Sequence, residues 1–274
     1  MKNIKILWTQ PTKSGLGDRC CDLLFVYAYA AMLNGELYTD WPEFEIKDID
    51  TLHRKLDIQL CNILKYIKFP EKIHFTKAND SKGMDILFDF YVGGGLSLES
   101  FYNKYVEKQF SLIEFQASVK KASQQFEFSQ EIKDYLSILP KSFVSLHIRR
   151  GDKVRKGNWN DGYFINDSEL EHLDSITMKA IDMYCNLEYE YLFICGDEDE
   201  KKKPFIDYAN SKNLKTFVTP EMPKWIETYF DIATMSKSDM IVASQKHSSF
   251  AKFPSLISNC KFFTVFDLEQ SKLI

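Results

Sequence analysis

The sequence predicts an α/β fold made of two Rossmann-like domains. Segments with strand and helix patterns alternate along most of the 274 residues, and the chain opens with a strand, a loop, a helix and a second strand. Residues 143–148 form an apolar run that ends in two arginines, which indicates a buried strand carrying charge to its carboxyl end. Ligands of open α/β sheets bind at that end. We place an amino-terminal domain at 1–139 and a ligand-binding domain at 140–274.

The composition is that of a globular protein with a substantial core, because 45% of the residues are hydrophobic and 15% are aromatic. The net charge of -4 comes from interspersed signs, which excludes a broad basic face for nucleic acid. The apolar stretch in the first ten residues, MKNIKILWTQ, is too short for a signal peptide, and no apolar segment of the sequence reaches the length of a membrane span. We expect a cytoplasmic protein, with peripheral membrane contact left open.

The cysteines are scattered through apolar contexts and lack the spacing of metal ligands. We interpret them as reduced core residues, so neither zinc nor disulfides are expected. They are Cys20, Cys21, Cys61, Cys185, Cys195 and Cys260.

The amino-terminal domain begins with a short strand at 4–8, a long apolar helix from Cys20 to Leu33, and a second strand at 37–39. Amphipathic spacing predicts one or two helices within 48–69, on the outside of this domain. A strand at 86–92 then ends in Gly93-Gly94-Gly95, and a helix covers 129–139 before Pro140. The three glycines lack the following lysine of a P-loop, which favours a flexible loop over a phosphate cradle.

The loop before the first helix reads Gly15-Leu16-Gly17-Asp18-Arg19. Two glycines at the start of a helix can bring backbone N–H groups and the positive helix end to an anion. The alternative is a tight connection with Asp18 as a helix cap and Arg19 facing solvent.

The carboxyl-terminal domain continues the alternation of strands and helices. Ser168 caps the first of its helices, and the helix from Lys224 to Lys237 is amphipathic. After the strand at 143–148, we predict helix 168–185, strand 189–195, a helix to about 211, helix 224–237, strand 239–243, helix 247–258 and strand 262–266.

The end of the central strand carries two arginines with different roles. Side chains alternate along a strand, so His147 and Arg149 share one face while Ile148 and Arg150 share the other. One guanidinium can therefore point to a ligand while the other points into the fold, and Asp152 can fix an arginine or cap the next segment of the chain. The alternative is a strand end with a surface ion pair.

Residues 147–153, HIRRGDK, closely match the H-[IV]-R-R-x-D-[KY] motif of the GDP-fucose-dependent fucosyltransferases, which include α1,2, α1,6 and protein O-linked enzymes. The opening also resembles the GLGNQ segment of the α1,2 enzymes, with Asp18 and Arg19 replacing the asparagine and glutamine. The serine pair Ser248-Ser249 before a helix is similar to the third family motif. The resemblance covers the opening and 143–258, whereas 45–140 has no recognisable counterpart.

This resemblance implies the glycosyltransferase B architecture, in which two Rossmann-like domains face each other across a cleft. It also implies inverting, metal-independent transfer of a sugar, foremost fucose, from a GDP-sugar to a hydroxyl of a glycan acceptor. A base takes the hydroxyl proton while GDP leaves from the opposite face. The alternatives are another GDP-deoxysugar or GDP-heptose as donor, or a nucleotide- or glycan-binding protein of the same fold without catalysis.

The resemblance nominates Arg149, Lys153 and the serine turn for the leaving diphosphate, because guanidinium forks and helix N-termini bind such groups. Asp18 is the proposed general base, with Asp152 and Asp231 as alternative carboxylates. The expected donor-binding residues are Gly15, Gly17, His147, Arg149, Arg150, Asp152, Asp197, Asp231, Ser248 and Ser249.

Two acidic positions keep alternative roles. Asp197 to Glu200 could bind a divalent metal, but we favour an acidic first turn that complements a helix dipole, so no metal is expected. The family also has a strand ending in [ST]-D-[DE] at the point of Asp197. Asp231 falls on the polar side of its helix and is either solvated or faces the cleft, as an aspartate does in a similar segment of the α1,6 enzymes.

Overall fold

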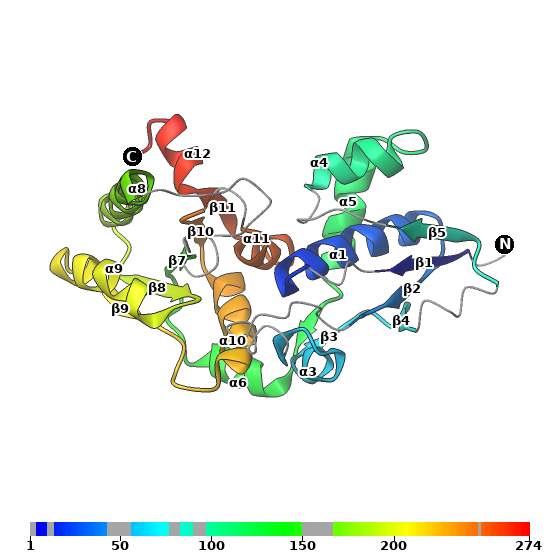
Figure 1. Cartoon of the computed structure of the whole chain (residues 1–274), viewed down its shortest axis with the longest axis horizontal. Coiled ribbons are helices and arrows are strands. Elements are labelled where there is room, and N and C mark those ends of the chain that lie inside the picture. Colours follow the sequence, from blue (N-terminus) through cyan, green and yellow to red (C-terminus); the bar gives the residue numbers. More distant parts are fainter. Residues whose placement is uncertain are drawn as a thin grey trace. The chain divides into compact units, whose positions relative to one another are not determined.

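The computed structural model describes residues 4–9, 14–42, 56–76, 83–89, 97–149, 167–245 and 248–274 (Figure 1). The chain divides into two compact units. The first consists of Met1–Tyr135, Met222–Tyr229 and Leu256–Ser258, and the second of Leu136–Glu221, Phe230–Ser255 and Asn259–Ile274. The expected boundary at 139/140 lies close to the first of these divisions, and two later segments join the first unit. No helix in these described ranges is long and apolar enough to cross a membrane.

The first unit contains a parallel sheet with the order β4-β2-β1-β5. The predicted opening of strand, helix and strand is confirmed, because β1 and β2 pair side by side with α1 between them in sequence (Figure 1). The elements are β1 (Lys5–Thr9), α1 (Leu16–Met32), β2 (Glu36–Asp40), β4 (Ile73–Phe75) and β5 (Ile86–Asp89).

Helix α1 is buried along most of its length, as its apolar sequence predicts. It packs against α5 (Leu112–Ser123), where the Phe25 ring lies 6.5 Å from Phe115 between centroids. The helix begins at Leu16 rather than at Cys20, because Gly15 adopts the extended backbone of an N-cap and residues 16–19 already form the first turn.

Shorter elements complete the described part of this unit. The predicted helix at 129–139 is confirmed as α6, whereas Gly93-Gly94-Gly95 lie outside the described residues. The remaining elements are α3 (Leu60–Tyr66), α4 (Leu98–Phe101), the π-helical turn η3 (Tyr102–Val106), α6 (Gln130–Ser137), and the antiparallel pair of β3 (Ile67–Lys68) with β6 (Glu127–Phe128).

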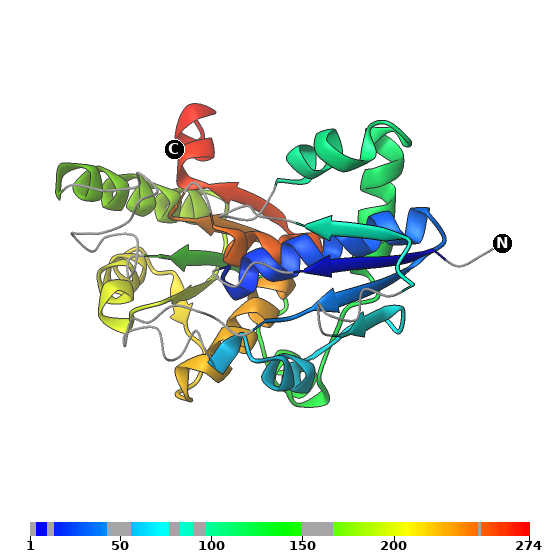
Figure 2. The ribbon, with the colours of Figure 1, turned by 45° about the vertical axis from the view of Figure 1, so that its right-hand side comes forward.

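The second unit contains a parallel sheet with the order β11-β10-β7-β8-β9. The central strand is β7, which is buried throughout, as the apolar run at 143–148 predicts. Figure 2 shows the strand from a second side. The strands are β7 (Val144–Ile148), β8 (Tyr191–Gly196), β9 (Lys215–Phe217), β10 (Met240–Ala243) and β11 (Lys261–Thr264).

Two apolar clusters cover the two faces of this sheet. One contains Val144, Leu146 and Ile148, and the other contains Phe143 and Met235. This alternation along β7 places helices on both sides, as in a doubly wound fold. The helices are α8 (Asp167–Asn186), α9 (Asp199–Ser211), α10 (Lys224–Lys237), α11 (Ser249–Leu256) and α12 (Val265–Gln270).

The predicted strand at 262–266 is wrong at its end, because the strand stops at Thr264 and Val265 begins α12. Thr264 caps this helix: its hydroxyl accepts from the Asp267 N–H at 3.1 Å, and the Asp267 carboxylate accepts from the Thr264 N–H at 2.7 Å. This reciprocal capping box outweighs the β-branched and aromatic character of 264–266.

Candidate functional site

The carboxyl ends of the second sheet bring several predicted site residues to one edge. Arg149 follows β7, Asp197 follows β8, and Ser244 follows β10. Because these neighbouring strands are parallel, their ends lie together where ligands of such sheets bind.

The backbones of β7 and β8 approach closely at this edge. Gly196 pairs with Ile148, and a Cβ atom on Gly196 would lie 2.2 Å from the Ile148 carbonyl oxygen. That separation is far inside van der Waals contact, so the pairing requires glycine. Because Gly196 has no side chain, the end of β7, which precedes Arg149, can lie this close to the end of β8, which precedes Asp197.

The backbone of Arg149 is held from the side of β10. Its N–H donates to the Ser244 hydroxyl at 3.1 Å, and its carbonyl accepts from the Gln245 side-chain amide at 3.4 Å. Ser244 is itself fixed, because its N–H donates to the His147 carbonyl at 2.9 Å. The backbone of the half-buried Arg149 is therefore fixed at the edge of the sheet.

His147 lies in the sheet on the side of α11. Its Nδ1 atom lies 3.2 Å from the Ser248 hydroxyl, and its ring centroid lies 5.2 Å from that of Phe250. Ser248 also accepts from the Ala251 N–H at 3.4 Å, so its side chain caps this helix. Ser249 is the first residue of α11.

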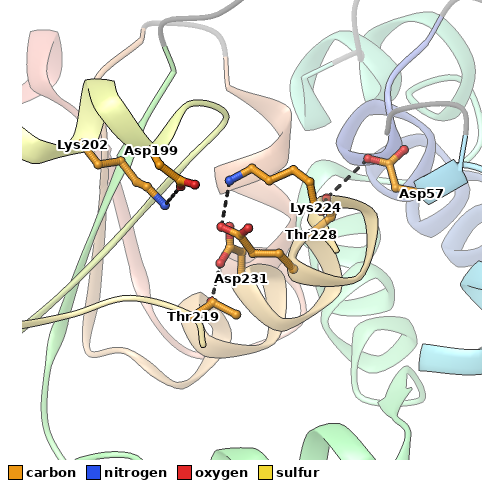
Figure 3. A network of polar contacts seen from close by, with 8 residues as sticks. Asp57, Asp199, Lys202, Thr219, Lys224, Thr228 and Asp231 are labelled. Atoms are coloured by element: carbon orange, nitrogen blue, oxygen red, sulfur yellow. Dashed lines mark hydrogen bonds and ion pairs between the residues drawn. The ribbon is translucent and has the colours of Figure 1, made fainter. Parts of the chain in front are cut away.

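Asp231 is not solvated, so that interpretation of its polar position was wrong. The residue is 4% exposed, and its Oδ1 atom accepts from the Thr219 hydroxyl at 2.5 Å (Figure 3). Thr219 follows β9 and is buried too. The segment after β9 therefore covers the polar side of α10 and supplies the hydrogen bond that a buried carboxylate needs.

The acidic residues after β8 form the start of α9, as the favoured interpretation predicts. Glu198 is the N-cap residue, and Asp199 and Glu200 lie in the first turn. Figure 3 shows Asp199 paired with Lys202, whose Nζ atom lies 2.7 Å from Oδ1. Within the described ranges, no cluster of three His, Cys, Asp or Glu side chains is arranged to hold a metal.

Asp18 lies in the first turn of α1 and is not its N-cap, so the capping alternative was wrong. Gly15 occupies the cap position, and Gly17 is already helical. A Cβ atom on Gly15 would lie 3.9 Å from Asp18 Oδ2, so the carboxylate bends back toward the cap. Asp18 is partly exposed at the positive end of the helix, where a negative charge is stabilised.

Arg19 is fully buried, which corrects the expectation that it faces solvent. Its Nε donates to the Ser14 carbonyl at 3.0 Å and its NH1 group to the Pro42 carbonyl at 2.6 Å. The guanidinium also lies over the Trp41 ring, 5.5 Å from its centroid. Burial lowers the pKa of Arg19 to about 10, which leaves it charged at neutral pH. Arg19 thus joins the loop before α1 to the residues after β2.

A second buried charged group in the first unit, Asp57, carries no signal in the sequence pattern. This residue is 6% exposed, and its Oδ2 atom accepts from the Thr228 hydroxyl at 3.5 Å (Figure 3). The Tyr229 hydroxyl donates to its carbonyl, and the Trp41 indole donates to the adjacent Ile58 carbonyl at 2.7 Å. These bonds attach the beginning of α10 to the segment before α3.

Three predicted site residues lie outside the described part of the chain: Arg150, Asp152 and Lys153. The roles assigned to them stay predictions.

No protein-family profile and no curated protein sequence matches this chain. Solved structures do resemble it. NodZ α-1,6-fucosyltransferase soaked with GDP-fucose matches with a TM-score of 0.54 and 13% identity, over 94% of this chain and 93% of that one. POFUT1 in complex with GDP matches with a TM-score of 0.51 and 14% identity, over 95% of this chain and 98% of that one. A likeness at this level of identity shows the fold, and it confirms the predicted α/β architecture of glycosyltransferase B type.

Proposed function

From the fold that the chain shares with NodZ and POFUT1, we propose that it is an inverting glycosyltransferase that moves fucose from GDP-fucose to a hydroxyl of a glycan acceptor. The observation that carries this proposal is the edge of the second sheet. There, Arg149 and Asp197 follow adjacent strands, and the serine-capped start of α11 follows β10. The first three residues of the HIRRGDK motif, His147 to Arg149, lie at the same edge.

The chemistry of the donor side is neutralisation of the leaving diphosphate. Arg149 carries a planar fork that can donate two parallel hydrogen bonds to phosphate oxygens, and Lys153 adds a point charge. The N-terminus of α11 adds backbone N–H groups and the positive end of a helix dipole. Such prearranged donors stabilise the charge that develops on GDP as the glycosidic bond breaks.

The chemistry of the acceptor side is removal of a hydroxyl proton. Of the candidates for the general base, Asp231 is the least suitable, because its carboxylate is buried and already accepts a hydrogen bond from Thr219. Asp18 is partly exposed in the first turn of α1 and is our assignment. Asp152 remains the alternative, and a role for Asp18 in positioning alone would also fit its place beside Gly15.

The variant Asp18→Asn separates these roles. Asparagine keeps the size and hydrogen-bonding ability of the side chain but cannot take a proton, so we expect kcat to fall by about 10² to 10⁴. Steady-state transfer rates between pH 6 and 9 measure this, and thermal unfolding checks the fold. A variant that turns over at the wild-type rate across this range would leave Asp18 with a structural role only.

Two other functions fit the same fold. The donor could be another GDP-deoxysugar or GDP-heptose, or the protein could bind a nucleotide or glycan without catalysis. The non-catalytic alternative is supported by the opening loop, where Asp18 and Arg19 replace the asparagine and glutamine of the family. Measuring which GDP-sugar is cleaved distinguishes the three functions. A protein that binds without catalysis would bind GDP but would not cleave any GDP-sugar to release it.

The first arm of the test measures nucleotide preference. A ligand that binds only the native state adds about 2.7 kcal/mol of stability at 100 times its dissociation constant. Thermal unfolding with GDP, UDP and CMP should therefore show a large shift with GDP and small shifts with the others. A shift with GDP no larger than that with UDP would contradict a GDP-sugar donor.

The second arm measures release of GDP from GDP-fucose and from other GDP-sugars, each with and without excess EDTA. We expect slow hydrolysis of the correct donor to survive the chelator, because arginine, lysine and helix-end groups neutralise the diphosphate in place of a metal. Activity that disappears with EDTA and returns with manganese would instead assign a metal to Asp197 and its neighbours.

A further inference from the structure

We propose that Arg19 is a positioning residue, which holds the turn at the start of α1 and so fixes the place of Asp18, the assigned general base. The conformation of this turn depends on the structure of the first unit alone. The effect on sugar transfer rests on the proposed function, and each of the two steps has its own experiment.

The start of α1 has no side chain that caps it. Helices commonly begin with Ser, Thr, Asp or Asn, whose side chain bonds to a backbone N–H of the first turn and fixes how the chain enters the helix. Gly15 occupies this position in α1 and makes no such bond. Glycine also has the widest choice of backbone conformations, so another group has to hold the turn.

Arg19 bonds to two consecutive carbonyl groups of this turn. Its backbone N–H donates to the Gly15 carbonyl at 3.1 Å, and its side-chain Nε donates to the Ser14 carbonyl at 3.0 Å. The guanidinium is planar and its donors have fixed directions, so these bonds set orientation as well as distance. Asp18 lies in the segment between the two bonded ends, and its place follows from theirs.

The guanidinium of Arg19 is itself anchored in the interior of the unit. The residue is fully buried, and its NH1 group donates to the Pro42 carbonyl at 2.6 Å. Its cation lies 5.5 Å from the centroid of the Trp41 ring, and the Trp41 indole donates to the Ile58 carbonyl at 2.7 Å. The turn is therefore tied to a side chain that cannot shift without breaking buried hydrogen bonds.

A buried arginine could also serve the stability of the core alone, and the variant Arg19→Lys separates the two roles. Lysine keeps the charge, but one ammonium group cannot reproduce the Nε and NH1 bonds in their fixed directions. A displacement of about 1 Å in an active site can lower a rate about 10²-fold. The matched control is Phe25→Leu, which disturbs the buried packing of α1 against Phe115 and leaves the turn intact.

Hydrogen exchange followed by NMR, without nucleotide, tests whether Arg19 holds the turn. The reporter is the backbone amide of residue 19, which bonds to the Gly15 carbonyl. We expect it to exchange about tenfold faster in Arg19→Lys and at the wild-type rate in Phe25→Leu. Wild-type exchange of this amide in Arg19→Lys would overturn the first step.

A double-mutant cycle tests whether Arg19 acts through Asp18. With GDP-fucose as donor, and well below the unfolding temperature of every variant, Arg19→Lys should lower kcat about 10- to 10²-fold in the wild-type background. In the Asp18→Asn background it should have no further effect, because the group that it positions has lost its chemistry. Phe25→Leu should keep the wild-type kcat although it unfolds at a lower temperature.

The cycle has clear contrary results. A wild-type kcat in Arg19→Lys, or the same loss in both backgrounds, would overturn the action through Asp18. If Arg19→Lys does not fold, Arg19→Gln takes its place in both experiments, since glutamine is the residue of the resembling family. If wild-type protein cleaves no GDP-sugar, the proposed function fails, while hydrogen exchange still decides whether Arg19 holds the turn.

Discussion

Replacement of Arg149 by lysine is expected to lower kcat/KM for sugar transfer about 10²- to 10³-fold, as large as the loss of one prearranged donor at a developing charge. The charge is kept, but an ammonium cannot reproduce the two parallel hydrogen bonds of a guanidinium on a phosphate. The backbone bonds of Arg149 to Ser244 and Gln245 do not involve its side chain, so the fold should be retained. Steady-state transfer and thermal unfolding measure the two effects.

The neighbouring arginine provides the comparison. Arg150 is expected on the opposite face of the strand, so Arg150→Lys should reduce stability or activity only moderately. If both variants keep equal activity, the assignment of the strand faces or of the motif itself is wrong.

Replacement of Gly196 by alanine is expected to lower the free energy of unfolding by about 3 kcal/mol or more, the upper range for overpacking in a core. The new methyl group would meet the Ile148 carbonyl at 2.2 Å, and both atoms belong to paired strands that have no flexible side chain to move aside. Urea unfolding without nucleotide measures the change.

The matched substitution is Gly15→Ala, where the nearest atom to the added Cβ lies at an ordinary 3.9 Å. The φ of -71° and ψ of 168° at this position suit any residue, so this variant should lose little stability beyond a weaker cap. Equal losses in the two variants would show that the strands separate easily at Gly196.

Sequence patterns predict the elements of this protein where one face or one run of residues decides the structure. The apolar run at 143–148 became β7, and the amphipathic pattern of 224–237 became α10 with the same limits. In both segments the buried positions can be read from neighbouring residues, as a continuous apolar run in one and as apolar residues repeating every 3.6 positions in the other.

Sequence patterns fail where a polar residue is buried by a partner far along the chain. Arg19 and Asp231 look solvent-exposed because they are charged, yet both are buried. Arg19 is satisfied by the carbonyl of Pro42, and Asp231 by the hydroxyl of Thr219. Asp57 escapes prediction altogether, since its partner Thr228 lies 171 residues away. The spacing of apolar residues does not predict such hydrogen bonds, because the two partners come together only in the folded protein.

The attachment of α10 to Asp57 also has a consequence for the order in which the protein matures on the ribosome. Domains generally fold as units, amino-terminal first, as the chain emerges. Here, Tyr229 stacks on Tyr66 with ring centroids 4.8 Å apart, so a stretch synthesised late completes the packing of the first unit. The first unit therefore cannot complete its packing until Tyr229 has been translated, and a chain that terminates before Met222 lacks the late segment of this unit.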